Sequence, residues 1–266
     1  MKILFVADVV GLPGRTALRS GLARLRAELR PDLVIANGEN AAGGNGLTPA
    51  IADEIFRAGC DVVTTGNHIW DRKEIIPYLA DHPRLLRPAN HPDGTPGRGT
   101  CVVAAPDGTP VGVANLMGRV FMPPVDDPFR AADVALDAFR REARVVVVDF
   151  HAEATSEKAA LAWYLDGRVS AVVGTHTHVP TADERLLPGG TAFVTDAGMT
   201  GPHDSVIGVE KTEAIERFLT QRPVRLSVAK EDPRLQAVLL EIDPSTGRAE
   251  SVRRVEHRGR AGEEHG

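Results

Sequence analysis

Short apolar runs alternate with amphipathic segments along most of the chain, and this alternation predicts its secondary structure. The run at residues 145–150 is almost continuously apolar, which is typical of a strand covered on both faces. Leu18, Leu22, Leu25 and Leu29 instead recur at helical spacing, with arginine and glutamate between them. Strands that alternate with helices in this way favour an α/β fold with parallel strands.

Strands and helices are expected in a regular order along the chain. The expected strands lie at residues 2–10, 32–36, 61–65, 101–105, 111–115, 145–150, 172–178, 192–196, 224–228, 235–242 and 249–255. The expected helices lie at residues 18–29, 49–58, 71–81, 128–141, 156–165 and 209–221. Thr48 and Pro49 are good first residues for the second of these helices, and Gly59 follows its end. A glycine-rich turn at residues 11–15 is expected before the first helix.

Some of the connections require antiparallel strands. The segment 106–110, Pro-Asp-Gly-Thr-Pro, joins two strands closely enough for a β-hairpin. The last third of the chain alternates like an antiparallel sheet across the turn at 243–247. We therefore expect two packed mixed β-sheets flanked by helices, in a single domain over residues 1–257. The polar segment 258–266 is expected to be a disordered tail.

Composition and charge narrow the class of protein. Hydrophobic residues make up 42% of the 266 residues and charged residues 25%, which excludes disorder of the whole chain. The net charge of −5 provides no long-range attraction to nucleic acid, so no strong nucleic-acid binding is expected. The first apolar run is broken by Asp8 and is too short for a signal peptide or a membrane span. With Cys60 and Cys101 as its only cysteines, the chain is expected to be cytoplasmic, without membrane association.

Polar side chains that can bind metal follow the ends of several predicted strands. The strongest signal is His176 with His178, because residues two apart in an extended segment point the same way. The carboxyl ends of parallel strands meet at one edge of a sheet, so such side chains converge if their strands share that sheet. Turns also favour Asp and Asn, which leaves a turn role open for those residues but does not explain the histidines. The candidates are Asp8, Glu39, Asn40, Asn67, His68, His151, His176 and His178.

The types of donor indicate the kind of metal. Carboxylate, carboxamide and imidazole groups without a cysteine thiolate suit divalent ions such as Mn, Fe or Zn. The donors exceed what one ion needs, whereas two ions about 3.5–4 Å apart, bridged by one carboxylate, would use them. The glycine-rich turn lacks both Gly-Lys-Ser/Thr and a complete G-x-G-x-x-G, so a phosphate-binding loop or a Rossmann-type dinucleotide site is disfavoured.

Blocks of these residues resemble the successive motifs of the calcineurin-like metallophosphoesterases. The blocks are Asp8, Gly-Glu-Asn at 38–40, Gly-Asn-His at 66–68, His151 and Gly-Thr-His-Thr-His at 174–178. The chain also resembles, more narrowly, the YmdB-like bacterial branch of this superfamily over nearly its whole length. The longer segments that carry this resemblance are residues 8–11, 37–42, 150–158 and 196–202. The resemblance implies a four-layer αββα metallophosphoesterase sandwich.

The resemblance also implies a role for each candidate. It assigns Asp8, Glu39, Asn40 and His178 to one ion, and Glu39, Asn67, His151 and His176 to the other. His68 would lie beside the substrate as a catalytic residue rather than on a metal. The wider superfamily usually has a histidine at the position of Val10, which weakens the first metal position here, and Asn40 is the replacement that we expect. The same superfamily has an aspartate where this chain has the bridging Glu39.

The implied activity is that of a metal-dependent phosphoric diester hydrolase with two divalent ions per chain. Fe or Mn is the expected metal, and Zn is an alternative. Hydroxide held by the metals would attack phosphorus while His68 assists departure of the alkoxide, a role that suits imidazole near neutral pH. Two divalent ions, two carboxylates and one hydroxide leave one positive charge, which a singly charged phosphodiester neutralises. The family resemblance points to 2′,3′-cyclic nucleotides as substrates and to a homo-oligomer.

The alternative hypothesis is a protein that is not primarily an enzyme. It would be a regulatory metal-binding protein that acts through partners in RNA metabolism, with little turnover. It would keep the metal residues but hydrolyse no phosphodiester. No base pocket is predicted from the sequence. Phe121, Trp70 and Tyr164 could stack a base but are interpreted as core side chains. Arg15, Gly44 and Asn45 could touch substrate but are interpreted as solvated loop residues.

Overall fold

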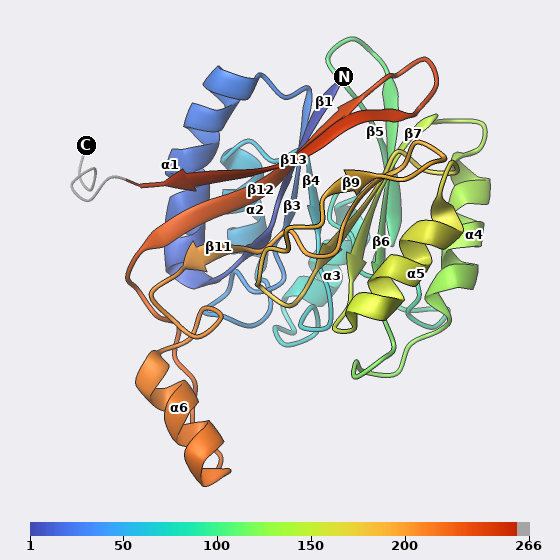
Figure 1. Ribbon diagram of the computed structural model, residues 1–266. Coiled ribbons are helices and arrows are strands. Elements are labelled where there is room, and N and C mark those ends of the chain that lie inside the picture. Colours follow the sequence, from blue (N-terminus) through green and yellow to red (C-terminus); the bar gives the residue numbers. More distant parts are fainter. Residues whose placement is uncertain (260–266) are drawn as a thin grey trace.

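Side chains on the two faces of the strands form separate hydrophobic clusters, and these clusters define the layers of the molecule. In the computed structural model, which describes residues 1–259, one cluster lies between the first sheet and its helices and contains Leu22 and Ile55. A second, with Phe5 and Val113, lies between the two sheets. A third, with Phe139, lies between the second sheet and its helices. The expected α/β fold with two packed mixed sheets and flanking helices is therefore confirmed (Figure 1).

Thirteen strands and six helices form these layers in the described residues. The strands are β1 Lys2–Val6, β2 Asp8–Val9, β3 Leu33–Asn37, β4 Val62–Thr64, β5 Thr100–Ala104, β6 Pro110–Met117, β7 Val145–His151, β8 Ala171–Thr175, β9 Arg185–Leu186, β10 Ala192–Val194, β11 Met199–Pro202, β12 Pro233–Ile242 and β13 Ala249–Arg258. The helices are α1 Gly11–Leu29, α2 Pro49–Arg57, α3 Ile75–Asp81, α4 Pro128–Phe139, α5 Thr155–Leu165 and α6 Lys211–Thr220.

Each sheet contains a run of parallel strands. The first sheet has the order β2-β11-β12-β1-β3-β4, with β13 paired to β12, and the second has the order β5-β6-β7-β8-β10-β9. Strands β1, β3 and β4 are parallel, as are β6, β7, β8 and β10. The predicted hairpin is present as β5 and β6. The carboxyl ends of β3, β4, β7 and β8 provide the side chains of the site described below.

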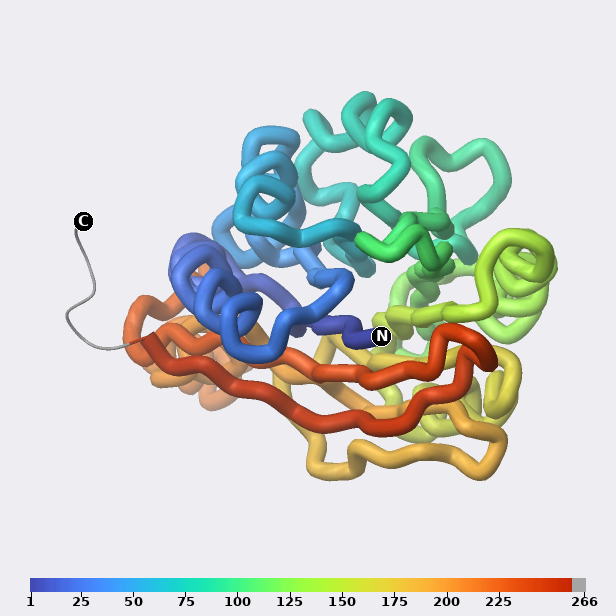
Figure 2. Tube along the Cα trace, turned by 90° about the horizontal axis from the view of Figure 1, so that it is seen from above, coloured from blue at the N-terminus to red at the C-terminus, as the bar shows by residue number. Residues whose placement is uncertain are grey.

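The C-terminal hairpin of β12 and β13 belongs to the first sheet and reaches the second. Seen from above in Figure 2, the hairpin (red) lies beside the segment around β9 and β10 (gold). Arg254 on β13 pairs with Glu184 at a distance of 3.0 Å, and the backbone N–H of Ala249 donates to the carbonyl of Gly190. The end of the chain therefore ties the two sheets together.

The predicted first strand is interrupted, and the predicted glycine-rich turn is part of a helix. β1 ends at Val6, and β2 then pairs with β11. α1 begins at Gly11, without an intervening turn. A Cβ atom on Gly14 would lie 2.4 Å from the carbonyl oxygen of Thr200 on β11. The glycine therefore lets the first turn of the helix pack directly against the sheet.

One expected strand in the last third of the chain is absent. Residues 224–228 do not form a strand, and Val228 makes an isolated bridge with Val209. β13 extends to Arg258, the first residue of the expected tail. Residues 260–266 of that expected tail lie outside the described residues. β9 and β11 are not evident from the sequence, because strands of two and four residues are too short to show a clear alternation of apolar and polar side chains.

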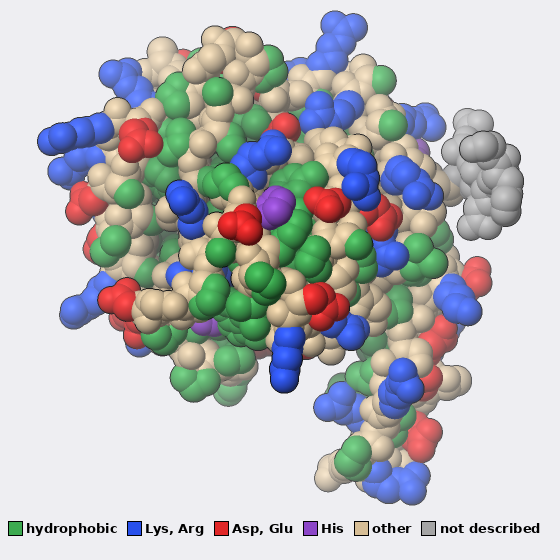
Figure 3. All heavy atoms as spheres, turned by 180° about the vertical axis from the view of Figure 1, so that it is seen from behind, with side chains coloured by type: hydrophobic (Ala, Val, Ile, Leu, Met, Phe, Trp, Pro, Cys, Tyr) green, Lys and Arg blue, Asp and Glu red, His purple; other side chains and the backbone are tan. Residues whose placement is uncertain are grey.

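Helix α6 projects from the two sheets as an arm (Figure 1). Ala214 is its buried residue, while Phe218 and Leu219 are each 80% exposed. The view from behind in Figure 3 shows hydrophobic, basic and acidic side chains mixed along this arm. The arm therefore presents large apolar side chains to its surroundings.

None of the helices within residues 1–259 is both long enough and apolar enough to span a membrane. Both cysteines are free, and burial raises the pKa of the Cys60 thiol to about 12.

Candidate metal centre

The seven predicted metal ligands converge where the two sheets meet, at the carboxyl ends of their strands. Asp8 begins β2, Glu39 and Asn40 follow β3, Asn67 follows β4, His151 ends β7, and His176 and His178 follow β8. Asp8, Glu39 and His151 are fully buried, and the side chains of His176 and His178 are 19% and 12% exposed. Both sheets therefore contribute to one site.

His151 is the centre of the first group of contacts. Its Nε2 atom lies 2.9 Å from Oε1 of Glu39, 3.0 Å from Oδ1 of Asn67 and 3.1 Å from Nδ1 of His176. The donor atoms of Glu39, His151 and His176 lie within 4.8 Å of one another. Such a cluster can hold a metal ion.

Asn40 and Asp8 belong to a second group that shares Glu39. The Nδ2 atom of Asn40 lies 3.2 Å from Oε1 of Glu39 and 3.2 Å from Nε2 of His178. Nε2 of His178 in turn lies 3.8 Å from Oδ2 of Asp8. Oδ1 of Asp8 is buried and has no hydrogen-bond partner among the described residues. A buried carboxylate oxygen without a partner is costly, and a bound cation would satisfy it.

The two histidines after β8 do not lie in an extended segment. β8 ends at Thr175, and the φ angles of His176 and His178 are 101° and 63°. Such left-handed values are uncommon for residues other than glycine and occur where the surroundings impose them. The backbone N–H of His176 donates to Oδ2 of Asp8, at 2.8 Å. The turn therefore directs the two rings to different groups, His176 to His151 and His178 to Asn40 and Asp8.

A buried ion pair supports the turn that carries His176 and His178. Nζ of Lys158 on α5 lies 2.7 Å from Oδ2 of Asp196, and both side chains are fully buried. The same oxygen accepts hydrogen bonds from the backbone N–H and the hydroxyl of Thr177, between the two histidines. The backbone N–H of Gly198 donates to Oδ1 of Asp196. The carboxylate therefore joins α5 to the histidine turn.

Charge at the centre is concentrated on Glu39 and His151. Burial acts to raise the pKa of Glu39, but the neighbouring His151 overcomes this and holds that pKa at about 2. Burial acts to lower the pKa of His151, but the attraction of Glu39 raises it to about 9. Burial, together with the charge of His151, lowers the pKa of His176 to about 3. In the chain without a cation, Glu39 and His151 thus form an ion pair and His176 is a neutral imidazole.

Gly66 lets the strand ends approach this closely. A Cβ atom at this position would lie 2.2 and 2.3 Å from ring atoms of His151 and 2.5 Å from Oε2 of Glu39. Any larger residue would therefore fill the space between the ligands. Together with the unsatisfied oxygen of Asp8 and the set of oxygen and imidazole donors, this shows that the residues fit a divalent cation.

His68 lies next to the cluster through its backbone, and its ring contacts Asp71. Its backbone N–H donates to Oε2 of Glu39, at 3.0 Å. Its Nδ1 atom lies 2.9 Å from Oδ2 of Asp71, and its side chain is 33% exposed. The ring is therefore partly exposed to solvent beside the cluster.

Two interpretations of residues around the centre are wrong. Phe121 is not a core residue, because it is 90% exposed, and Tyr164 is 44% exposed. Arg15 is not a solvated loop residue, because its Nη1 donates to the carbonyl of Ala41 and its Nε pairs with Glu54 at 2.9 Å. Arg15 therefore fastens the loop that follows the predicted ligands Glu39 and Asn40.

Sequence reasoning also missed residues that contact the predicted ligands. Oε2 of Glu153 lies 3.1 Å from Nε2 of His176. Asp149 and Thr175 are fully buried, and Thr175 contacts the ring of His151. The position of Asp149, a charged residue inside an apolar strand, was a sequence signal that this residue has a special role. No spacing rule in the sequence identifies the residues that Asp149 contacts.

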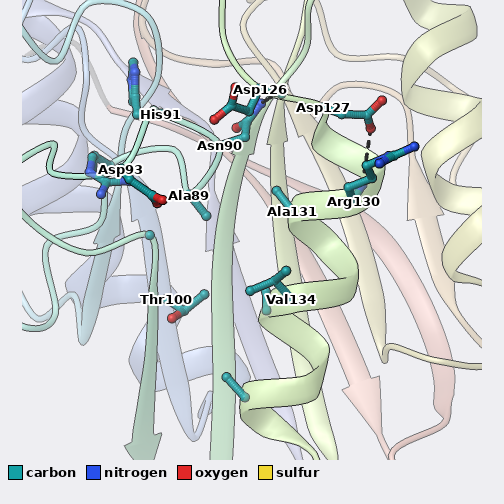
Figure 4. Close-up of a pocket in the computed structure, with 14 residues that line it drawn as sticks. Ala89, Asn90, His91, Asp93, Thr100, Asp126, Asp127, Arg130, Ala131 and Val134 are labelled. Carbon is teal, nitrogen blue, oxygen red and sulfur yellow. Dashed lines mark hydrogen bonds between the residues drawn. The ribbon is translucent and has the colours of Figure 1, made fainter.

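A cavity of about 770 Å³ lies elsewhere in the molecule and is lined by side chains between residues 87 and 138. Figure 4 shows its lining by residues from the segment before β5 and from the start of α4, among them Asn90, His91 and Arg130. None of the predicted ligands lines it. The cavity and the metal centre are therefore separate features.

The chain has two mixed sheets with helices on their outer faces, and a cluster of histidine and carboxylate side chains lies at their common edge. This is the architecture of a metallophosphoesterase sandwich. A family model described as "YmdB-like protein" matches residues 4–255. The chain belongs to the YmdB-like family, and the predicted resemblance is confirmed.

Known relatives align over nearly the whole chain. A Bacillus subtilis protein named 2′,3′-cyclic-nucleotide 2′-phosphodiesterase is 50% identical over 96% of each chain. The crystal structure of a hypothetical protein from Thermus thermophilus superposes with a TM-score of 0.91 at 46% identity, covering 97% of this chain and 99% of that one. The crystal structure of a novel phosphatase from Mycoplasma pneumoniae superposes with a TM-score of 0.91 at 34% identity, covering 97% and 93% of the two chains.

Proposed function

We propose that this phosphoric diester hydrolase opens 2′,3′-cyclic nucleotides at a centre of two divalent cations. The observation that carries the proposal is the group of Glu39, His151 and His176, of which the first two are fully buried, in a chain 50% identical to a protein named 2′,3′-cyclic-nucleotide 2′-phosphodiesterase. The donor types suit Fe or Mn, with Zn as an alternative.

The contacts of the seven ligands support two cation positions. Asn67, His151 and His176 would hold one cation, and Asp8, Asn40 and His178 the other. Glu39 contacts both groups, since the same Oε1 atom lies 2.9 Å from His151 and 3.2 Å from Asn40. Glu39 would therefore be the ligand shared by the two proposed cations. When bound, two such cations supply Lewis-acid activation of water and of the phosphoryl group.

The residues of the chain would perform the remaining steps. Hydrolysis breaks one phosphorus–oxygen bond of the ring, and cleavage at the 2′ oxygen leaves a 3′-phosphate and a free 2′-hydroxyl. The departing oxygen needs a proton, and we assign its delivery to His68, whose ring is partly exposed beside the cluster. Asp71, at 2.9 Å from Nδ1, would orient the ring so that Nε2 faces the substrate.

Self-association is the second part of the proposal. The outward side chains of Phe218 and Leu219 on α6 support it, since a second copy of the chain would remove them from water. The base of the arm also contacts the site, because Nδ1 of His178 lies 2.9 Å from the carbonyl oxygen of Ile207.

Metal analysis together with turnover tests the proposed function. The protein purified and supplied with Mn or Fe should hold about two ions per chain and hydrolyse 2′,3′-cyclic AMP and bis-p-nitrophenyl phosphate. Two ions without turnover on either substrate would instead favour a regulatory protein that acts through partners. A chain that holds no metal under these conditions would refute both.

His68→Ala tests the assigned proton donor. Turnover should fall about 10²- to 10⁴-fold, the usual contribution of a general acid, while metal content stays the same because the backbone contact to Glu39 is kept. His82→Ala is the matched control, since His82 bonds the carbonyl of Tyr78 at the end of α3. Unchanged turnover in His68→Ala would remove His68 from the mechanism.

A further inference from the structure

A fully buried carboxylate lies between the two sheets, directly behind the metal centre. Asp149 on β7 is 0% exposed, although it lies in an otherwise apolar strand. Its Oδ1 atom accepts a hydrogen bond from the hydroxyl of Thr175 on β8, at 2.7 Å. Its Oδ2 atom accepts from Nδ2 of Asn37 on β3, at 3.0 Å, and from the hydroxyl of Thr64 on β4. Asp149 therefore joins two strands of each sheet at the point where the predicted ligands begin.

The contact through Thr175 reaches the ring of His151. Nδ1 of His151 lies 2.9 Å from the hydroxyl oxygen of Thr175, which is also fully buried. A threonine hydroxyl carries one proton and two acceptor positions. Because that proton is directed to Asp149, the oxygen can only accept from His151. The proton of the His151 ring is thereby placed on Nδ1, and Nε2 points to Glu39, Asn67 and His176 with its lone pair available.

The contact through Asn37 reaches the backbone of Glu39. The side chain of Asn37 donates to Asp149 through Nδ2 and accepts from the backbone N–H of Glu39 through Oδ1, at 3.2 Å. This orientation of the amide follows from its partners, since a carboxylate only accepts and an N–H only donates. One buried carboxylate is thus linked to two of the ligands, one on each sheet.

We propose that Asp149 is a positioning residue of the metal centre, which acts through Thr175 to orient the His151 ring with Nε2 toward the cation and through Asn37 to hold the turn that carries Glu39. The inference deepens the proposed function, on which it rests. Partners behind a metal-binding histidine fix its tautomer and orientation, and their loss typically weakens metal binding about 10- to 100-fold. Here a threonine hydroxyl stands between the carboxylate and the histidine.

Zinc affinity of matched variants tests the link through Thr175. Thr175→Val keeps the shape of the side chain but cannot accept from His151, and we expect its affinity for zinc, measured by calorimetric titration, to fall about 10- to 100-fold. Thr175→Ser keeps the hydroxyl and should bind zinc nearly as well as the wild type. Thr191→Val is the control for loss of a buried hydroxyl, because Thr191 is equally buried but bonds the carbonyl of Val169. A folded Thr175→Val protein with wild-type affinity would overturn the proposal.

The protonation of His151 in the wild type provides a test that needs no variant to fold. Nitrogen-15 NMR of the imidazole rings in the zinc-loaded, diamagnetic protein should show Nδ1 of His151 protonated and Nε2 bound to zinc. The same nitrogen should be protonated in the metal-free protein. An unprotonated Nδ1 in either state would refute the link.

The failure of this inference is distinguishable from that of the proposed function, because neither readout uses turnover. A wild type that binds zinc with Nδ1 protonated but hydrolyses no phosphodiester would refute the activity and support the positioning role. Asp149→Asn tests both links at once: its carboxamide oxygen cannot replace two acceptor oxygens, so its loss of zinc affinity should exceed that of Thr175→Val. A loss smaller than that of Thr175→Val would exclude Asp149 as the common support.

Discussion

Glu39 and His151 are the two residues on which the charge of the metal centre depends. Both are fully buried, and their opposite charges stabilise each other where neither could be ionised alone. Nε2 of His151 faces Glu39, Asn67 and His176, so the same atom that holds a proton in the metal-free chain would hold the cation. A proton and a metal ion therefore compete for one position.

This competition predicts how metal affinity depends on pH. The pKa of His151 is raised to about 9 in the chain without a cation, so binding between pH 6.5 and 8.5 must displace its proton. Mn affinity at the position that His151 lines should rise with pH in this window, by up to about tenfold per unit, and His151 should release one proton when that ion binds. Calorimetry in buffers of different ionisation enthalpy measures both quantities.

The stability of the metal-free protein should change in the opposite direction. A group whose pKa is raised by folding stabilises the native state below its ordinary pKa, here 6.5, and this contribution is lost as the pH rises through about 9. The free energy of unfolding should therefore decrease over the range in which Mn affinity increases. Metal affinity that does not vary with pH would contradict the competition.

At the scale of elements, helix α5 supports the turn that carries His176 and His178. The Lys158–Asp196 pair is fully buried, and Asp196 bonds the backbone and hydroxyl of Thr177. Left-handed backbone at both histidines needs such support, because that conformation is unfavourable outside glycine. The helix therefore has a part in the geometry of the site although it contributes none of the predicted ligands.

Lys158→Met should destabilise the protein by about 3–5 kcal/mol, because it leaves the charge of Asp196 buried without its partner. Denaturant unfolding of the metal-free protein measures this. The control is Lys211→Met, whose pair with Asp204 has side chains about half exposed, so its removal should cost less than about 1 kcal/mol. The double variant Lys158→Met with Asp196→Asn should recover part of the stability. Equal effects of Lys158→Met and Lys211→Met would show that the buried pair is not a support.

At the scale of the whole molecule, the two sheets form the site by meeting at one edge, and the α6 arm extends away from it (Figure 1). Four layers are held by three hydrophobic clusters, and the C-terminal hairpin ties the two sheets. Within the described residues, the α6 arm is connected to these layers only at its base. Its exposed side chains are the ones that the proposed self-association would remove from water.

Phe218→Glu should therefore reduce self-association, because it places a charge in the proposed apolar contact. Light scattering coupled to size-exclusion chromatography measures the mass of the particle, and turnover per chain should be unchanged. Val134→Glu is a suitable control, since Val134 is 71% exposed on α4, at a distance from the arm in sequence and in the fold. An unchanged oligomeric mass in Phe218→Glu would exclude this face as the contact.

Local pattern was enough to predict most elements and the two sheets, and the resemblance of the motifs was enough to predict the family. The structure brings together the ligands that were predicted. Hydrophobic periodicity depends on neighbouring residues, and metal-binding side chains occur at strand ends for reasons that are visible in the sequence. Pattern failed where the chain departs from regular structure. Residues 11–15 were predicted to form a turn because the role of Gly14, close packing of α1 on β11, depends on a partner almost two hundred residues away.

The sequence by itself determined the chemistry of this protein: which donors are present, in which order, and on the ends of which strands. Only the tertiary structure decided how those donors are supported, since hydrogen bonds among Asp149, Thr175 and Asn37 join strands from both sheets. It also decided the left-handed turn of His176 and His178, which depends on contacts with Asp8 and Asp196. The physical reason is that a side chain's type is local, whereas its orientation and charge are set by groups that only folding brings within a few ångströms.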